Sequence, residues 1–439
     1  LPAPVEIIEQ RSVAPTLGKD SIDSGVRAIM YGGIVVVVFM AIYYMFAGIV
    51  ADLAIILNLL LLPLGMIVAA GVLGIFAKDV SGGGPIQLQV LTLPGIAGIL
   101  LTVGMAVDAN VLIYERIREE TKAGKRLWSA ISAGYDRAFV TIIDANITTL
   151  LVGVILFIFG SGPIRGFSVT LCAGIMASMF TALVVTKLFF QLLAQKTSLS
   201  KLRMLSIVKQ TAIDFVSKRK IAVSVSLAVI VLTWVLVLFR GITDPAAVFA
   251  VDFRGGVSAT YAFDPENRVS SEALRSALEA AGIPDVHIQY QEEMTVKGRE
   301  YLQVKTGAEK LAGTPMLQRV TDSLKSAFPQ AGFSVLQQDE VGSQIGSELK
   351  RRAVWSIVLA LIGIIVYLAW RFEFGFAVGA IVALAHDVLV TVGVYVVLGR
   401  QLSLPVVAAL LTIVGYSVND TIVVFDRIRE DLKLSRSQS

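Results

Sequence analysis

The sequence predicts a polytopic α-helical membrane protein with an internal pseudo-symmetric repeat and an extracytoplasmic α+β domain of the ferredoxin-like type. Three observations support this prediction. The 439 residues are 55% hydrophobic and 16% charged, whereas soluble domains carry about 25% charged residues. Long apolar stretches recur along the chain, and one motif of sixteen residues occurs in two of them.

Nine apolar stretches are long enough to cross a bilayer, because a hydrocarbon core of about 30 Å requires about 20 residues of helix. They lie at about residues 26–46, 49–75, 89–114, 138–159, 166–192, 221–239, 353–370, 374–398 and 402–425. Only a few residues separate some of them, as at Phe46-Ala47-Gly48 and Arg371-Phe372-Glu373. These short connections predict tight helical hairpins.

Basic residues cluster in the segments that follow the third and the fifth stretch. Cytoplasmic loops carry such an excess of Lys and Arg, so we expect both segments to be cytoplasmic. Counting spans from there puts residues 240–350 outside and the C-terminal tail inside. The same bias accounts for the net charge of +4, so nucleic acid is not an expected partner.

Residues 240–350 are the only sizeable soluble segment. Strands are expected at residues 257–263, 286–291, 300–306 and 333–338, with a turn at Lys297-Gly298. Helices are expected over Glu272–Ala281, between Ser271 and Gly282, and after the capping pair Thr314-Pro315. The resulting order β-α-β-β-α-β is the ferredoxin-like arrangement. The paired glycines in Asp252-Phe253-Arg254-Gly255-Gly256, where this segment begins, predict close backbone approach or a hinge.

The repeated motif reads GMAVDANVLIYERIRE at residues 104–119 and GYSVNDTIVVFDRIRE at residues 415–430, 311 residues later. Six positions are identical, and most others keep their chemical character. Leu93-Pro94, upstream of the first copy, also recurs as Leu404-Pro405. Internal repeats of membrane helices are typical of transporters, whose ion sites lie where the repeats meet.

Each copy carries an aspartate within the apolar run, Asp108 in the first and Asp420 in the second, one position out of register. A carboxylate within a membrane helix costs roughly 2.5–3.5 kcal/mol on insertion scales, so it usually lines an ion path or meets a partner. Two interpretations stay open. Either the acids bind and release protons, or they are structural. A structural acid would be hydrogen-bonded to Asn110, Asn419 or Thr421, or paired with a Lys or Arg.

Other polar residues within apolar stretches allow the same two interpretations. Asp144, expected about one turn inside the fourth span, could line the same path or form a hydrogen bond near the cytoplasmic surface. His386 and Asp387 lie in mid-span. They could form a proton relay, since histidine titrates near neutral pH, or a satisfied hydrogen bond between helices.

The sequence has no pattern of an enzyme. It contains no phosphate-binding G-x-x-x-x-G-K-[ST] motif and no Cys or His spacing of a metal site, and its single cysteine, Cys172, lies in an apolar run. We therefore expect no cofactor beyond a coupling ion, which would be the proton or alternatively sodium.

The two motif copies and the FRGG sequence at residues 253–256 resemble the SecD and SecF protein-export membrane proteins, fused as one SecDF chain. That family is similar to the resistance-nodulation-division transporters, which have six spans in each half. Residues 1–195 are similar to SecD and residues 205–439 to SecF. The resemblance implies that Asp108 and Asp420 belong to a proton path.

The resemblance also implies a division of the chain. We expect a SecD-like transmembrane half of five spans at residues 25–195 and SecF-like spans at residues 221–239 and 351–427. Around them we expect the tail of a first external (P1-like) domain at residues 1–24, a basic cytoplasmic linker at residues 196–220, an external ferredoxin-like (P4-like) domain at residues 240–350 and a cytoplasmic tail at residues 428–439. A six-plus-six design further predicts that the chain lacks a start and the last two spans.

The function that the resemblance implies is that of an accessory component of the Sec translocase, in the bacterial cytoplasmic membrane, which uses the proton motive force to promote preprotein export. The expected partners are the SecYEG translocon with SecA, YajC-like and YidC-like membrane proteins, exported unfolded preproteins and membrane lipid. Two alternatives stay open: a proton-coupled exporter of small molecules or lipids from the same superfamily, and a passive translocon scaffold.

Overall fold

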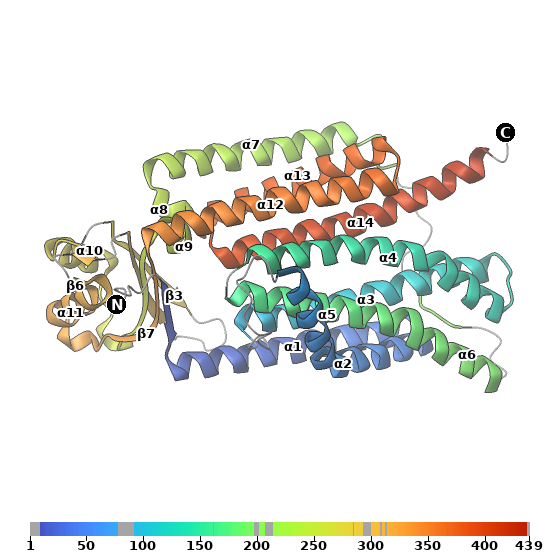
Figure 1. Ribbon diagram of the computed structural model, residues 1–439, viewed down its shortest axis with the longest axis horizontal. Coiled ribbons are helices and arrows are strands. Elements are labelled where there is room, and N and C mark those ends of the chain that lie inside the picture. Colours follow the sequence, from blue (N-terminus) through green and yellow to red (C-terminus); the bar gives the residue numbers. More distant parts are fainter. Residues whose placement is uncertain are drawn as a thin grey trace. The chain divides into compact units, whose positions relative to one another are not determined.

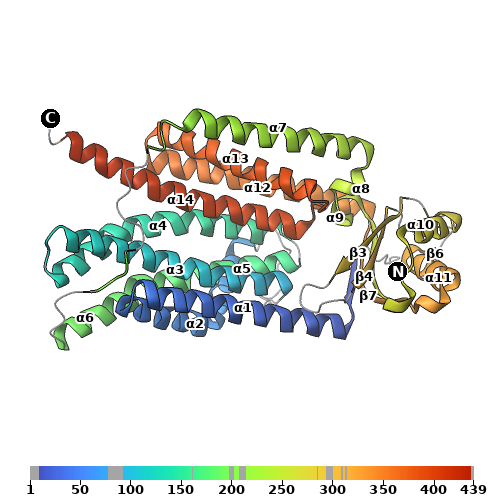
Figure 2. The same cartoon turned by 180° about the vertical axis from the view of Figure 1, so that it is seen from behind.

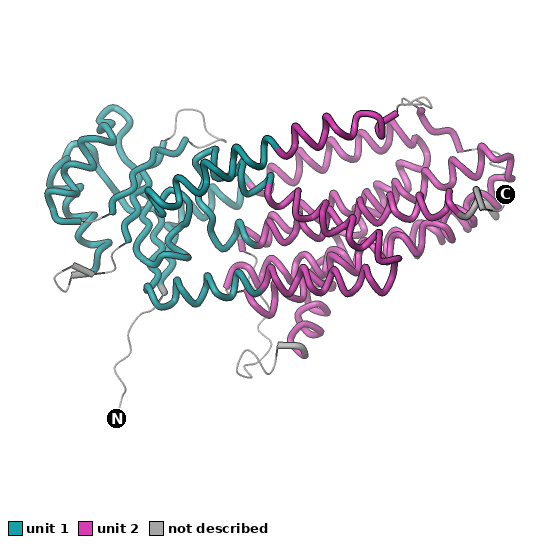
Figure 3. The backbone as a smooth tube through the Cα atoms, turned by 90° about the horizontal axis from the view of Figure 1, so that it is seen from above, with its two compact units in different colours: residues 1–24, 228–355, 390–407 teal, residues 25–227, 356–389, 408–439 magenta. Residues whose placement is uncertain are grey.

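The structure, a computed structural model, describes residues 9–77, 92–160, 162–196, 202–206, 214–283, 285–292, 300–307, 310–311 and 314–436. The predicted turn at Lys297-Gly298 lies outside these residues. Contacts divide the chain into two units, coloured separately in Figure 3. Unit 1 comprises Leu1–Ser24, Ala228–Trp355 and Val390–Val407, and unit 2 comprises Gly25–Leu227, Ser356–Leu389 and Ala408–Ser439.

Within the described residues, nine helices are long and apolar enough to cross a membrane, as the sequence predicts. In chain order they are α1 (Pro15–Tyr43), α2 (Phe46–Ala77), α3 (Leu93–Lys122), α4 (Leu127–Phe159), α5 (Pro163–Phe180) with its continuation, α7 (Arg219–Thr243), α12 (Ser343–Arg371), α13 (Phe374–Val397) and α14 (Leu404–Arg436). The continuation of α5 is a π-helical turn, η1 (Thr181–Val185), followed by α6 (Thr186–Lys196).

Several helices extend beyond the apolar stretches that predicted them. Helix α4 begins at residue 127 rather than 138, α12 at residue 343 rather than 353, and α14 continues to residue 436 rather than 425. At the extended ends of α12 and α14, charged side chains form ion pairs one turn apart, among them Glu348–Arg352 at 2.9 Å and Asp426–Arg429 at 3.4 Å. Such pairs stabilise a helix, so the polar residues extend the helices.

The two predicted hairpins are confirmed, although the first turns at Tyr44-Met45, because the predicted connection Phe46-Ala47-Gly48 begins α2. Met45 adopts a positive φ of 50° between α1 and α2. A Cβ atom at Gly48 would lie 1.9 Å from the carbonyl oxygen of Met40, so only glycine fits where the two helices meet. The second hairpin spans the few residues between the end of α12 and the start of α13.

Helix α5 is the most enclosed helix of unit 2 and lies against α2, α3 and α4 (Figure 2). Gly174 of α5 allows it to approach α3 closely, because a Cβ atom there would lie 2.1 Å from the Oγ1 atom of Thr102. Close approach through small residues is the usual way in which membrane helices associate.

Unit 1 contains a five-stranded antiparallel sheet in the order β1-β7-β2-β4-β3. The strands are β1 (Glu9–Val13), β2 (Gly256–Ala262), β3 (His287–Glu292), β4 (Glu300–Thr306) and β7 (Ser334–Val341). Helices α10 (Ser271–Ala280) and α11 (Met316–Ala327) cover one face of the sheet (Figure 1). A core between helices and sheet includes Tyr261, Leu274, Leu278 and Leu324, all fully buried.

The remaining elements are short. They are α8 (Pro245–Val248), α9 (Val251–Arg254), the 3-10 turns η2 (Pro265–Asn267) and η3 (Pro329–Ala331), and the two-residue strands β5 (Lys310–Leu311) and β6 (Thr314–Pro315).

The predicted helix caps of this domain were wrong at two places. The cap of α10 is Ser270, one residue before the predicted Ser271, because Ser270 has extended backbone and its hydroxyl accepts from the Ala273 amide at 3.2 Å. Thr314 does not cap α11, because Thr314-Pro315 pairs instead with Lys310-Leu311 as a short ladder. Near the N-terminus, β1 pairs with β7 and so becomes the edge strand of the sheet.

Replacing Gly174 with alanine should destabilise the helix bundle, because the added methyl group would overlap the buried Thr102 side chain. Overpacking of this kind costs about 1–3 kcal/mol. The measurement is the midpoint of thermal unfolding in detergent. The matched control is Gly71→Ala in α2, where a Cβ atom would meet nothing within 4 Å, so this variant should unfold at or above the wild-type temperature. An unchanged midpoint for G174A would show that the α3–α5 contact is loose.

Candidate functional site

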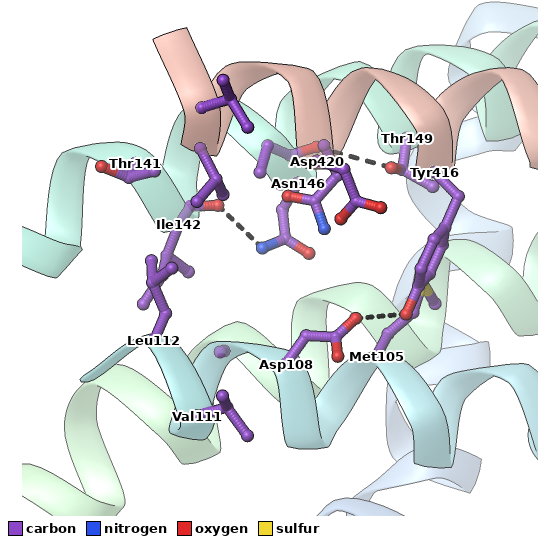
Figure 4. A pocket seen from close by; sticks show the side chains of 15 residues that line it. Met105, Asp108, Val111, Leu112, Thr141, Ile142, Asn146, Thr149, Tyr416 and Asp420 are labelled. Carbon is purple, nitrogen blue, oxygen red and sulfur yellow. Dashed lines mark hydrogen bonds between the residues drawn. The ribbon is translucent and has the colours of Figure 1, made fainter. Parts of the chain in front are cut away.

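A cavity of about 360 Å³ lies between the two motif helices and α4. In Figure 4, Asp108 of α3 and Asp420 of α14 both project toward this hollow. Helix α4 contributes the polar side chains of Thr141, Asn146 and Thr149. Most of the remaining lining is apolar, so the acids and the α4 polar groups are where an ion would be held.

Equivalent positions of the two motif copies line the cavity together. The pairs are Met105 with Tyr416, Asp108 with Asn419, Ala109 with Asp420, and Leu112 with Val423. Their spacing of three and four residues defines one face of each helix. Both copies therefore turn the same face toward the cavity, and the one-residue offset still leaves one acid on each helix.

Asp108 is linked to the opposite motif helix by a hydrogen bond, which the Tyr416 hydroxyl donates to its Oδ2 atom. Both Asp108 and Asp420 are exposed to the hollow rather than packed among apolar side chains. Asn110, predicted as a possible partner of an acid, instead donates from Nδ2 to the Ala106 carbonyl at 2.9 Å and does not line the cavity.

Asp387 lines a second hollow of unit 2, of about 490 Å³, together with Asp420 and Thr421, and His386 is bonded to Asp387 from beside that hollow. Asp387 Oδ1 lies 2.8 Å from His386 Nδ1, and the Ser417 hydroxyl donates to its Oδ2 at 2.5 Å. Nε2 of His386 is hydrogen-bonded to Ser226 of α7. This network therefore connects α7, α13 and α14, and it ends beside Asp420.

The two remaining predicted residues lie close to Asp420 on α14. Asn419 lines the first cavity, and Thr421 lines the second hollow. The Thr421 hydroxyl donates to the Ser417 carbonyl of its own helix at 2.9 Å, so it does not bond either acid.

Asp144 lies apart from the cavity, although its neighbour Asn146 lines it. Its carboxylate lies 2.6 Å from the Arg371 Nε atom and accepts a hydrogen bond from the Tyr367 hydroxyl at 2.9 Å. Because α4 begins at Leu127, Asp144 is near the middle of the helix. The side chain is 10% exposed and both carboxylate oxygens have a partner, which is typical of a structural ion pair.

Ion pairs join the two motif copies at one end of this cavity. Arg116 of the first copy pairs with Glu430 of the second at 2.9 Å, and Arg427 of the second pairs with Glu119 of the first at 3.3 Å. Thr141, which lines the cavity, donates to Asp426 at 2.8 Å. The arginine of each copy thus reaches the glutamate of the other, and the cavity is bounded there by charged side chains.

Sequence reasoning missed Tyr416, Arg371 and these reciprocal pairs. Tyr416 could have been found, because it lies one helical turn before Asp420 and occupies the position equivalent to Met105. Arg371 lies in an expected hairpin, where nothing in the sequence indicates its partner on α4.

Breaking the Asp144–Arg371 pair should lower stability, because it leaves one buried charge without a partner. Such losses are about 3–5 kcal/mol, and we expect the lower end, since the Arg371 side chain is 27% exposed. Thermal unfolding of D144N, R371Q and the double variant would give the coupling energy. The double variant should lose less stability than the two single variants lose together. Strict additivity would show that the two side chains do not interact.

Comparison with known proteins identifies the family. The family described as "Protein export membrane protein SecD/SecF, C-terminal" matches residues 2–196 and 319–439. The SecDF translocase subunits of Thermus thermophilus and Brucella abortus are 37% and 32% identical over 99% and 100% of this chain. The SecD subunit of Syntrophobacter fumaroxidans is 55% identical over 44% of the chain.

A solved structure supports the same relationship. The crystal structure of SecDF, a translocon-associated membrane protein from Thermus thermophilus, superposes with a TM-score of 0.80 at 35% identity and covers 99% of this chain. This chain covers 55% of that structure, and it spans about half the length of the SecDF relatives it matches, 54% and 55%. The chain belongs to the SecD/SecF family of protein-export membrane proteins and is a multi-pass protein of the bacterial inner membrane.

Proposed function

We propose that the chain forms the proton-coupled membrane part of a Sec translocase subunit, which uses the proton motive force to promote preprotein export. The observation that carries this proposal is the cavity in which Asp108 and Asp420, one from each motif copy, face the same hollow. The family membership indicates that the process is protein export, because the matching relatives are named protein translocase subunits.

Pseudo-symmetry between the halves is part of this proposal. Four equivalent pairs line the cavity, and the arginine and glutamate of each copy pair with those of the other. We assign the SecD-like half to residues 25–195 and the SecF-like spans to residues 221–239 and 351–427. In repeat transporters the coupling ion binds between repeats, which then move against each other.

The proposed cycle begins when a proton from the external side neutralises one of the two acids. Loss of that charge changes which helix packing is favoured, because the Asp108 carboxylate accepts the Tyr416 hydrogen bond that links α14 to α3 across the cavity. Each proton that falls through 100 mV supplies about 2.3 kcal/mol, which shifts a two-state equilibrium about 50-fold. Export of a whole preprotein would therefore need many cycles.

The sheet domain of unit 1 is proposed to act outside the membrane. Without β1, its order β2-α10-β3-β4-α11-β7 and the strand neighbours β7-β2-β4-β3 agree with a ferredoxin-like domain. The positive-inside bias supports an external location for residues 240–350. We propose the SecYEG translocon with SecA, YajC-like and YidC-like proteins, and exported preproteins as partners.

Replacing Asp108 or Asp420 with asparagine should abolish proton flux and reduce secretion, because an amide cannot take up and release a proton at neutral pH. Flux is measured in proteoliposomes without sodium, and secretion in cells that lack the native protein. The matched control is Asp136→Asn, since Asp136 is an exposed residue of α4 that pairs with Lys187 at 3.3 Å, away from the cavity. D136N should behave as wild type in both assays.

The same variants separate the alternatives. Normal secretion by D108N and D420N at normal protein levels would contradict proton coupling and favour a passive scaffold. Flux that occurs only when sodium is present would identify sodium, rather than the proton, as the coupling ion. Lost flux with normal secretion, together with raised sensitivity to toxic compounds, would favour a small-molecule or lipid exporter.

A further inference from the structure

The loop that precedes motif helix α14 is tightly bonded to the segment that leads into the sheet domain. The Ala250 amide donates to the Leu402 carbonyl at 2.8 Å, and the Leu402 amide donates to the Val248 carbonyl at 2.7 Å. Phe249 and Leu402 form a parallel β-bridge between these bonds. We call residues 246–252 together with residues 398–404 the clamp; both segments belong to unit 1.

Side chains add further bonds to the clamp. Gln401 donates to the Ala246 carbonyl and accepts from Lys305 of strand β4. Arg240, near the end of α7, donates to the Val396 carbonyl at 2.8 Å in the last turn of α13. Burial lowers the pKa of Lys305, while the carboxylates of Asp252 and Asp339 act in the opposite direction. The loop is therefore held from the sheet and from the segment leading into the domain, while Arg240 of α7 holds the end of α13 just before the loop.

Asp252 joins three parts of unit 1 through its two carboxylate oxygens. Oδ1 accepts from Arg11 Nη2 of strand β1 at 3.0 Å, and Oδ2 accepts from the Leu404 amide at 3.0 Å. Leu404 is the first residue of α14, and the first amides of a helix have no acceptor within the helix. Asp252 is 6% exposed. Its carboxylate thus holds the start of α14 against the sheet edge.

The backbone after Asp252 has little conformational freedom. Gly255 and Gly256 have φ values of 75° and 117°. A Cβ atom at Gly255 would lie 2.7 Å from the Ser343 Cα atom at the start of α12, and one at Gly256 would lie 2.1 Å from the Thr306 carbonyl oxygen. The predicted close backbone approach is confirmed, and it makes this connection a tight junction between α9, α12 and the sheet.

We infer that Asp252 is a positioning residue that couples displacement of α14 to the sheet domain. The inference rests on the proposed function, because α14 also carries Asp420, sixteen residues after Leu404. A helix moves largely as a rigid rod, so a shift at Asp420 reaches Leu404, and the clamp passes it to β1 and β4. Asp252 itself takes no part in proton transfer.

The test is Asp252→Asn in the protein as the cell expresses it. Asparagine has one acceptor oxygen and would direct its NH2 group at either Arg11 or the Leu404 amide. We expect proton flux in proteoliposomes to stay at the wild-type level and secretion to fall about tenfold, a typical size for coupling between sites. Gln401→Ala, which loosens the clamp from the loop side, should likewise leave proton flux unchanged and lower secretion.

Asp264→Asn is the matched control, since Asp264 also accepts from two donors, the Glu266 amide at 3.2 Å and Asn267 Nδ2 at 2.9 Å, but in an exposed turn. It should leave flux and secretion unchanged. Normal secretion by both D252N and Q401A would overturn the inference, as would equal loss of flux and secretion. Absence of flux in the wild-type protein would instead refute the proposed function.

A cross-link tests the rigidity of the clamp directly. Phe249 and Leu402 are bridge partners, and neighbouring strands lie about 4.7–4.9 Å apart, which is within the reach of a disulfide. The F249C/L402C protein should secrete normally after oxidation, because a coupling clamp stays closed throughout the cycle. Loss of secretion that reducing agent restores would show that the clamp opens, and would overturn the inference.

Discussion

The low dielectric of the membrane interior is the constraint on which the rest of this structure depends. A carboxylate there requires water, a counter-charge or hydrogen-bond donors. Two of the acids described above meet that requirement through residues far away in the chain. Asp144 on α4 meets Arg371 on α12, and Asp108 on α3 meets Tyr416 on α14. The polar residues thus specify which helices are neighbours, while the apolar surface specifies only that they cross the membrane.

The acids fall into two classes, according to whether both of their carboxylate oxygens accept hydrogen bonds. Asp144 and Asp252 are buried, and both oxygens of each are bonded to donors from other elements. Such acids fix geometry, and a change of their charge would break several contacts at once. Asp108 and Asp420 face a cavity instead. On the proposed function, this difference allows proton uptake to alter packing without dismantling the bundle.

The sequence predicted the nine spans, the two hairpins and most strands, because apolar runs and alternation are local signals. It also singled out both cavity acids, because their repetition could be read directly. It placed α4, α12 and α14 too short, and in α12 and α14 ion pairs one turn apart extend the helix through polar residues. Long-range pairing had no local signal, so the addition of β1 to the sheet and the Arg371–Asp144 pair could not be predicted.

The reciprocal pairs Arg116–Glu430 and Arg427–Glu119 have the pattern of an isologous dimer interface, in which residue i contacts j and j contacts i. In a symmetric homodimer every substitution appears on both sides. Two copies within one chain are free of that condition, because each can change while the other is kept. The Asp108–Asn419 and Ala109–Asp420 correspondences are differences of this kind, and they place the aspartates on the two sides of one cavity at positions that are not equivalent.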